Sequence, residues 1–236
     1  MMSDGSISGY TCTHTEKGNI ELVSPILNGE SDLRMVNRFL TAINKSGATV
    51  DRTCGTHISV GLNGKMRWER MSLTNKVAVA NRIVDFYGHF MNVFDAISPN
   101  CRNHAENGYI GGVGRLYNDG STSMSRYSAI NLKQYITYGR IEFRQPGMTL
   151  DKKKIGMWLK VINAMVSMAL NENHVSRTMD LDTMPKTLTG FVQYLGIGIS
   201  LQTTLFDRIS HMADTYSGQR TMRREVLFGG PSSELV

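Results

Sequence analysis

Apolar and polar residues alternate in several stretches of the chain, and this alternation predicts strands with one polar face. The clearest stretch is "YGRIEFRQPG", residues 138–147. Its apolar side chains share one face, and its other face carries Arg140, Glu142 and Arg144. A carboxylate between two guanidiniums is either a solvated strand face or the wall of a site that handles a metal ion and phosphate groups. The remaining motifs of the chain bear on that choice.

Apolar residues recur at helical spacing in the longer segments. One predicted helix has its N-cap at Ser31 and its C-terminal glycine at Gly47. The longest predicted helix runs from about Thr74 to Ile97, where Pro99 stops it. Further helices are predicted over about residues 150–172, 186–195 and 201–212.

Strand patterns dominate the first third of the chain, in "GSISGYTCTH", "NIELVSPIL" and "TVDRTCGTHISVGLNG". Two more follow in "SRYSAINLKQY" and "YGRIEFRQPG". Strands and helices do not alternate regularly, which favours an α+β fold with a mostly antiparallel sheet and long helices packed on one face. Composition is even along the chain, so we expect a single domain over residues 1–216 and a polar tail over residues 217–236.

The composition of the 236 residues, 41% of them hydrophobic, is sufficient for a substantial core. No apolar run reaches the ~18–20 residues that a membrane helix needs, and no signal peptide is visible at the N-terminus. Cys12, Cys54 and Cys101 are odd in number and widely separated, which argues against a disulfide framework. A cytoplasmic protein is therefore expected.

The formal net charge is +6 and the isoelectric point is about 9.3. This charge suits nucleic acid, nucleotide phosphates or an acidic substrate equally well. No zinc-finger spacing, RNA-recognition signature or basic zipper is present. Nucleic-acid binding would rest on charge alone, and it is not the expected function.

The stretch "CGTHISVG", residues 54–61, places His57 on a strand face with small residues, Ser59 and Gly61 among them. The room around the ring suits an imidazole that approaches a ligand or a metal. The alternative is a hydrogen-bonded structural histidine. Cys54 falls on the opposite face, and we expect it to be a small buried hydrophobe.

The other candidate residues lie in four short motifs. Glu142 beside Arg144 is either a surface ion pair worth about 0–1 kcal/mol or a hard-cation ligand beside a phosphate fork. The stretch "SRYSAINL" contributes Arg126 and Asn131, and "SDGS" and "ELVSP" contribute Asp4 and Glu21. Taken singly, each of these four is also compatible with a half-buried strand, a turn or a solvated side chain.

Taken in order, "DGS", "ElvSP", "CG-x-H", "RY-x-x-x-N-L" and "iEfR" resemble the amidoligase family of bacteria and phages. That family is similar to a distant branch of the glutamine synthetase and glutamate–cysteine ligase fold. The resemblance extends from Asp4 to about Ala169, and the order of the five motifs makes it more specific than any one of them.

The resemblance implies a glutamine synthetase-like catalytic domain that joins a carboxylate to an amine with ATP, through an acyl phosphate. It implies ATP and Mg²⁺ (or Mn²⁺) as cofactors. His57 and Glu142 match metal ligands on the nucleotide side, and Asp4 and Glu21 match acidic positions on the other metal. The implied partners are a small-molecule or peptide carboxylate and an amine donor.

The resemblance also assigns binding roles to the remaining candidates. Arg144 and Arg126 match arginines that hold the transferring phosphate or the substrate. Ser59, Arg140 and Asn131 are expected to contact the nucleotide.

The sequence departs from the family pattern at two places. The family signature is Cys-Gly-x-His-x-His, and Ser59 stands at the second histidine. The family also has a Gly-x-Glu-x-Glu strand upstream of "DGS", and no such strand precedes Asp4. The chain is therefore expected to be N-terminally truncated relative to the family: either its start is misplaced, or a separate polypeptide supplies this strand. The alternative is a non-catalytic descendant that serves as a binding or structural module.

Overall fold

The computed structural model of the chain describes residues 2–3, 20–21, 23–24, 26–50, 54–62, 66–102, 112–122, 125, 127–171, 180–216, 218 and 220–229. The chain forms two compact units, and each is described by itself. Unit 1 consists of Met1–Thr56 and Gly147–Gly156, and unit 2 of His57–Pro146 and Met157–Val236. None of the helices in the described ranges is long and apolar enough to cross a bilayer.

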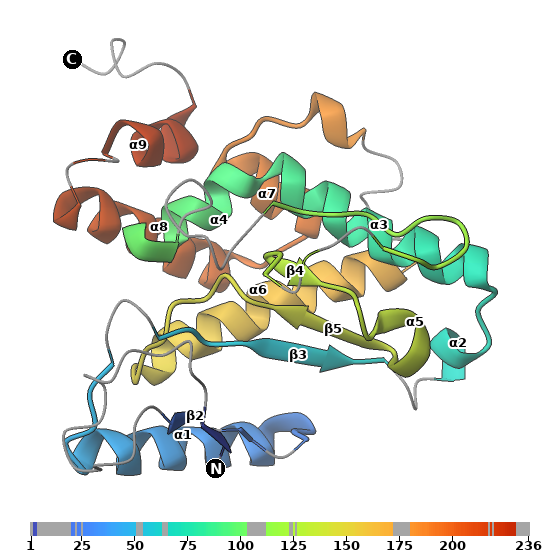
Figure 1. The fold of residues 1–236 in the computed structure, drawn as a ribbon. Helices are drawn as coiled ribbons and strands as arrows, with labels where there is room; N and C mark the ends of the chain where they lie inside the picture. The colour runs from blue at the N-terminus through green and yellow to red at the C-terminus, as the bar shows by residue number, and fades with distance from the viewer. Residues whose placement is uncertain are drawn as a thin grey trace. The chain divides into compact units, whose positions relative to one another are not determined.

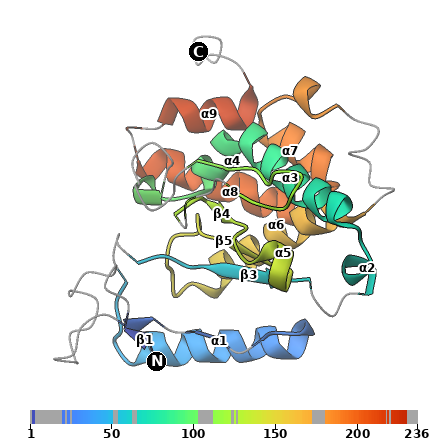
Figure 2. The ribbon, with the colours of Figure 1, turned by 45° about the vertical axis from the view of Figure 1, so that its right-hand side comes forward.

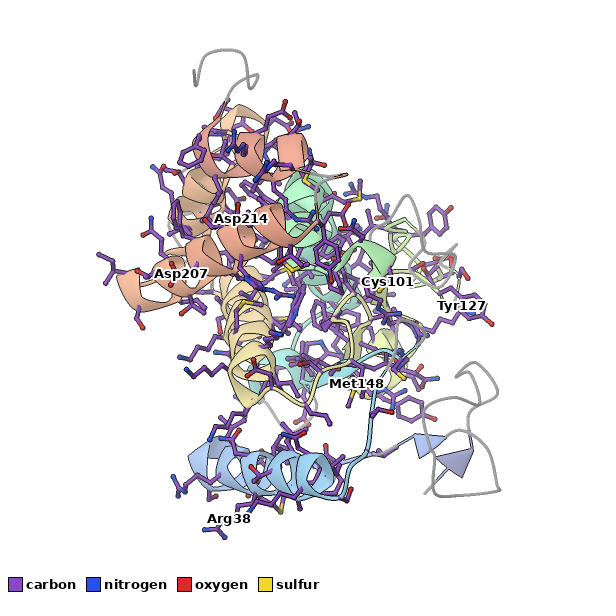
Figure 3. All side chains as sticks on the ribbon, turned by 90° about the vertical axis from the view of Figure 1, so that its left-hand side faces the viewer. Arg38, Cys101, Tyr127, Met148, Asp207 and Asp214 are labelled. Atoms are coloured by element: carbon purple, nitrogen blue, oxygen red, sulfur yellow. The ribbon has the colours of Figure 1, made fainter. Side chains whose placement is uncertain are left out.

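Unit 1 contains a strand pair and one long helix. β1 (Met2–Ser3) pairs antiparallel with β2 (Ile20–Glu21). α1 (Gly29–Lys45) carries exposed polar residues such as Arg38, which Figure 3 labels. The predicted strand "GSISGYTCTH" lies outside the described residues.

Both ends of α1 are set by local hydrogen bonds. The predicted N-cap at Ser31 is wrong, because the N-cap is Asn28. The backbone N–H of Asn28 donates to Asp32 Oδ2 at 2.6 Å, which satisfies an end group and starts the helix earlier. Gly47 has a φ of 78°, so the predicted C-terminal glycine is confirmed.

Unit 2 contains a small antiparallel sheet whose central strand carries Glu142. The strands are β3 (Ile58–Gly61), β4 (Ile130–Asn131) and β5 (Arg140–Phe143), in the order β3-β5-β4. Ser59 on one side and Asn131 on the other both stand opposite Glu142. The sheet therefore brings three sequence-distant polar residues to one level.

Helices make up most of the described part of unit 2. They are α2 (Met66–Glu69), α3 (Leu73–His89), α4 (Met91–Ile97), α5 (Tyr135–Tyr138), α6 (Lys152–Leu170, of which residues 157–170 belong to this unit), α7 (Leu188–Leu195), α8 (Ile199–Thr215) and α9 (Arg220–Phe228). Short 3-10 turns cover Asn100–Arg102 and Leu181–Thr183. The α+β class is confirmed in a coarser form, because the described part of the chain is mostly helical and its three-stranded antiparallel sheet is small.

The core of unit 2 lies between the apolar face of the sheet and the long helices. Figures 1 and 2 show α3, α6 and α7 on the same side of this sheet. Ile130, Ile141 and Phe143 are at most 3% exposed. An aromatic cluster continues the core between α3 and α7, where the Phe86 and Phe191 rings lie 5.3 Å apart. Because the apolar face of the sheet is buried against the helices, the face that carries Glu142 is the polar one.

The longest predicted helix is two helices. α3 ends at His89 and α4 begins at Met91, with Phe90 between them at φ −99° and ψ 23°. Ser72 caps α3 by accepting the N–H of Asn75 at 3.2 Å. The apolar stripe continues across Phe90, which explains why periodicity alone predicts one helix.

Two further predictions differ from the structure. Of the predicted strand "SRYSAINLKQY" only Ile130–Asn131 is β4, because the chain then turns into α5, whose C-cap Gly139 has a φ of 62°. The region predicted as a polar tail contains α9. Val226 of α9 is 2% exposed, and Arg223 donates to the carbonyl oxygen of Ala96. These contacts anchor α9 to α4.

Candidate functional site

The polar face of the sheet follows from the alternation in β5. Ile141 is buried, Glu142 is half-buried and Arg140 is exposed, as the sequence pattern predicts. Arg144 follows the last residue of β5, and its backbone N–H donates to the Ala129 carbonyl at 2.9 Å. This bond keeps the strand geometry for one more residue, so Arg144 shares the face of Glu142.

Glu142 is the centre of the site, and both of its oxygens accept hydrogen bonds. His57 Nδ1 lies 3.2 Å from Oε1 of Glu142. Arg144 Nη1 donates to the same oxygen at 3.1 Å. Asn131 Nδ2 donates to Oε2 at 2.8 Å. The predicted juxtaposition of His57 and Glu142 is therefore confirmed, and its role in metal binding stays a prediction.

These contacts keep the carboxylate ionised. Burial acts to raise the pKa of Glu142, but the hydrogen bond and charge of His57, the charge of Arg144 and the hydrogen bond of Asn131 outweigh it. Together they lower the pKa of Glu142 from its ordinary value of 4.5 to about 2. The site thus contains a permanent negative charge compensated by its neighbours.

His57 retains one ring nitrogen for another partner. Its side chain is 30% exposed, and Nδ1 faces Glu142. A carboxylate on one ring nitrogen fixes the tautomer and leaves Nε2 with a lone pair that can bind a metal ion or a proton. Within the described residues, the site therefore presents Nε2 of His57 as its most suitable ligand atom.

Arg144 has donors to spare. Its side chain is only 16% exposed, and Nη1 is engaged by Glu142. Its Nε is buried and has no hydrogen-bond partner among the described residues. Because a buried donor without a partner costs free energy, such a group calls for an explanation. Nε and Nη2 together form the planar fork that matches a carboxylate or phosphate.

Ser59 and Arg140 lie on the same sheet face and are exposed. Ser59 stands opposite Glu142, and Arg140 stands opposite Gly61. Arg140 therefore places a second guanidinium on this face, two residues from Glu142 along β5, and the glycine beside it leaves space.

Three predicted site residues are not placed. Asp4 and Arg126 lie outside the described residues, and the structure describes only the backbone of Glu21, in β2 of unit 1. No group of three or more His, Cys, Asp or Glu side chains within the described ranges is arranged to hold a metal ion. Of the four predicted metal ligands, two are together in unit 2. Cys54 is 8% exposed, as predicted for a small buried residue.

Two residues at the site were missed by the sequence reasoning. Gln145 is 1% exposed and Arg102 is 4% exposed, and both hold the backbone around Arg144. A signal was present in "RQPG", because a polar residue on the apolar side of a strand pattern needs a buried partner. No comparable signal marks Arg102.

The site is partly buried on the polar face of the sheet, with the Glu142 and Arg144 side chains each 16% exposed. Two hollows of about 370 and 460 Å³ lie in unit 1, against α1 and the start of α6. Neither is lined by His57 or Glu142.

Comparison with protein families adds one finding. Residues 1–85 match the model of a family described as "Putative amidoligase enzyme". For that part of the chain, the match confirms the resemblance to the amidoligase family. No curated protein and no solved structure matches the chain.

The matched segment holds four of the nine predicted site residues. Asp4, Glu21, His57 and Ser59 lie within it, whereas Glu142 lies beyond it. The pairing of β3 with β5 nevertheless brings His57, from the segment that matches the amidoligase family, to the carboxylate of Glu142. The fold thus brings the "CG-x-H" and "iEfR" motifs together, while Asp4 and the side chain of Glu21 lie outside what the structure describes.

Proposed function

We propose that the protein is an ATP-dependent carboxylate–amine ligase that works through an acyl-phosphate intermediate. One observation carries the proposal: His57 and Arg144 meet on the same oxygen of Glu142, at 3.2 and 3.1 Å. The imidazole of His57, which can bind a cation, therefore lies beside the guanidinium of Arg144, which can bind a phosphate. The match of residues 1–85 to the amidoligase family supports the same reaction class.

The residues fit a nucleotide-bound cation in one particular way. Both oxygens of Glu142 are occupied by protein donors, so Glu142 acts best as the group that orients His57. Nε2 of His57 is then the ligand atom. When bound, Mg²⁺ or Mn²⁺ would neutralise charge on the nucleotide phosphates. Asp4 and Glu21 remain proposed ligands for the other metal.

Arg144 has the electrostatic role in phosphoryl transfer. In transfer of a phosphoryl group to a carboxylate, negative charge is spread over the oxygens of the transferring group. A guanidinium whose Nη1 is held by Glu142 presents Nε and Nη2 to those oxygens in a fixed plane. Because the guanidinium is already in place, no free energy is spent on moving it, and it stabilises the negative charge of the transition state.

The other polar residues would extend the site over the face of the sheet. Ser59 donates its hydroxyl to a phosphate oxygen, Arg140 offers a second cationic contact, and Asn131 holds the second oxygen of Glu142. Arg126 is the remaining proposed phosphate or substrate arginine. The substrates would be a small-molecule or peptide carboxylate and an amine donor. A glutamine synthetase-like architecture for the whole domain is part of this proposal.

Isothermal titration of the full chain with MgATP and with MnATP tests the proposal. We expect saturable binding by the wild type and at least tenfold weaker binding by His57→Ala and Glu142→Gln. His211→Ala and Glu225→Gln change exposed residues of α8 and α9 and serve as matched controls. Absence of binding by the wild type, or equal binding by all variants, would support a non-catalytic binding module instead.

A further inference from the structure

Two buried polar side chains, Gln145 and Arg102, hold the backbone of residues 144–146. The side chain of Gln145 is 1% exposed and lies on the core side of the strand. Its Oε1 accepts the hydroxyl of Tyr87 from α3, and its Nε2 donates to Asp95 Oδ1 of α4 at 2.8 Å. Gln145 thus ties the end of β5 to two helices.

The second buried side chain is Arg102, which belongs to the 3-10 turn after α4. Its Nη2 donates to the carbonyl oxygen of Arg144 at 2.8 Å and to that of Pro146 at 3.4 Å. Arg102 and Gln145 therefore act on the same three-residue segment from the core side. Their four contacts come from elements distant in the sequence.

The segment has few ladder bonds of its own. β5 ends at Phe143, and beyond it the Arg144 N–H to the Ala129 carbonyl is the ladder-type bond that the structure records for Arg144. Among the described residues, pairing resumes only at the Gly55–Gly147 bridge, so residues 144–146 have few ladder bonds, and a guanidinium on such a segment could sample several directions. Buried hydrogen bonds in a water-excluded core limit such motion because their loss leaves unsatisfied groups.

We infer that Gln145 and Arg102 are positioning residues that fix the guanidinium of Arg144 against Glu142. Successive side chains of a strand point to opposite faces, so Arg144 lies on the polar face and Gln145 in the core. Fixing the side chain of Gln145 therefore also fixes the direction in which Arg144 leaves the backbone. The free fork of Arg144 is thereby held ready for an oxyanion. This inference rests on the proposed function only in taking that oxyanion to be a nucleotide phosphate.

A polarity swap tests Gln145. Gln145→Glu keeps the size of the side chain but brings a second carboxylate against Asp95, so the contact becomes repulsive. Combined with Asp95→Asn, the hydrogen bond returns with donor and acceptor exchanged. Because contacts within one hydrogen-bond network are energetically coupled, we expect the MgATP affinity of Gln145→Glu to be about tenfold lower than that of the wild type. The double variant should recover to within about threefold of the wild type.

Arg102→Lys tests the second anchor. The variant keeps the positive charge, but the ammonium of a shorter, flexible side chain no longer lies where Nη2 of Arg102 bonds both carbonyl oxygens. We expect MgATP affinity to fall by about three- to tenfold. If Gln145→Glu does not fold, Tyr87→Phe replaces it, because it removes only the hydroxyl that donates to Gln145.

A readout on Arg144 itself separates positioning from stability. The ¹⁵N–¹H signal of Arg144 Nε is recorded in the ligand-free protein, where it should move in Gln145→Glu and return in the double variant. Asn81→Ala is the matched control, since Asn81 makes two hydrogen bonds to the backbone of Leu116 in a different loop. It should lower the free energy of unfolding and leave both the Arg144 signal and MgATP affinity unchanged.

The outcomes keep this inference and the proposed function distinct. If Arg144→Ala weakens MgATP binding but neither anchor variant does, the positioning role is overturned and the ligase proposal stands. If Arg144→Ala binds MgATP like the wild type, the ligase proposal fails. In that case the positioning role is tested only by the Arg144 Nε signal of the ligand-free protein. An unchanged signal in Gln145→Glu and Arg102→Lys overturns the inference.

Discussion

Nδ1 of His57 lies 3.2 Å from Oε1 of Glu142, although the two residues come from different strand segments distant in sequence. The register explains the contact. Ser59 stands opposite Glu142 in an antiparallel pair, so His57, two residues earlier, is level with Arg144. A single carboxylate oxygen therefore serves two neighbours, and the residues proposed to contact the cation and the phosphate are linked through it.

The lowered pKa of Glu142 predicts an acid-sensitive contribution to stability. The pKa is about 2 in the folded chain and ordinarily 4.5. Because the folded value is the lower one, the contribution is fully present above about pH 4.5 and is lost as the pH falls toward about 2. Its size is at most about 3 kcal/mol. Urea unfolding of wild type and Glu142→Gln between pH 7 and pH 2 should show the difference between them shrinking over that window. A constant difference would refute the assignment.

Asn131→Asp should weaken the site from the other side of the sheet. The substitution replaces the Nδ2 donor, 2.8 Å from Glu142 Oε2, with a second carboxylate. Like charges at this distance should raise the pKa of Glu142 and lower the free energy of unfolding by about 1–3 kcal/mol. Asn131→Ser, which adds no charge, should cost less. Chemical denaturation of both variants at pH 7 makes the comparison, and equal losses would argue against the electrostatic explanation.

Arg144→Lys separates charge from fork geometry. Lysine preserves the positive charge beside Glu142 but has no counterpart of the Nε and Nη2 pair. We expect MgATP affinity to drop about tenfold, while the midpoint of thermal unfolding changes little. Calorimetric titration and thermal unfolding on the same samples provide both quantities. Affinity at the wild-type level would mean that the orphan Nε of Arg144 is not a ligand-binding group.

The apolar face of β5 predicts a purely structural effect. Ile141 is completely buried, so Ile141→Ala should lower the free energy of unfolding by about 2–5 kcal/mol. Ile199, which is 81% exposed, supplies the control, and Ile199→Ala should change stability by less than about 0.5 kcal/mol. Urea denaturation followed by circular dichroism measures both. Equal effects would show that this face of the sheet is not the core.

Much of the local geometry was predictable from the sequence because it depends on short periodic patterns. Period-two alternation in "YGRIEFRQPG" correctly separates buried Ile141 from half-buried Glu142, and the small-residue face around His57 correctly leaves room for its ring. The order of the motifs then suggested that His57 and Glu142 converge. Each of these inferences uses only neighbouring residues or motif order.

The remaining features depend on particular hydrogen bonds and backbone turns, local or tertiary, that hydrophobic periodicity does not encode. The N-cap of α1 is Asn28, whose backbone N–H donates to Asp32, whereas the sequence pattern predicted the cap at Ser31. The predicted strand before β5 is cut short by α5, since a left-handed glycine at position 139 allows a turn back into the sheet. The anchoring of Arg144 by Arg102 joins residues whose chain separation hides their relationship.

The measurement that tests the central claim most directly is proton NMR of the histidine rings during titration with MnATP. Paramagnetic Mn²⁺ broadens the signals of ring protons close to it, and the chain has six histidines. The proposed role of Nε2 predicts that the ring signals of His57 broaden first, at substoichiometric MnATP, and that Glu142→Gln weakens this effect. Sharp His57 signals at saturating MnATP would contradict the proposal that His57 binds a nucleotide-bound cation.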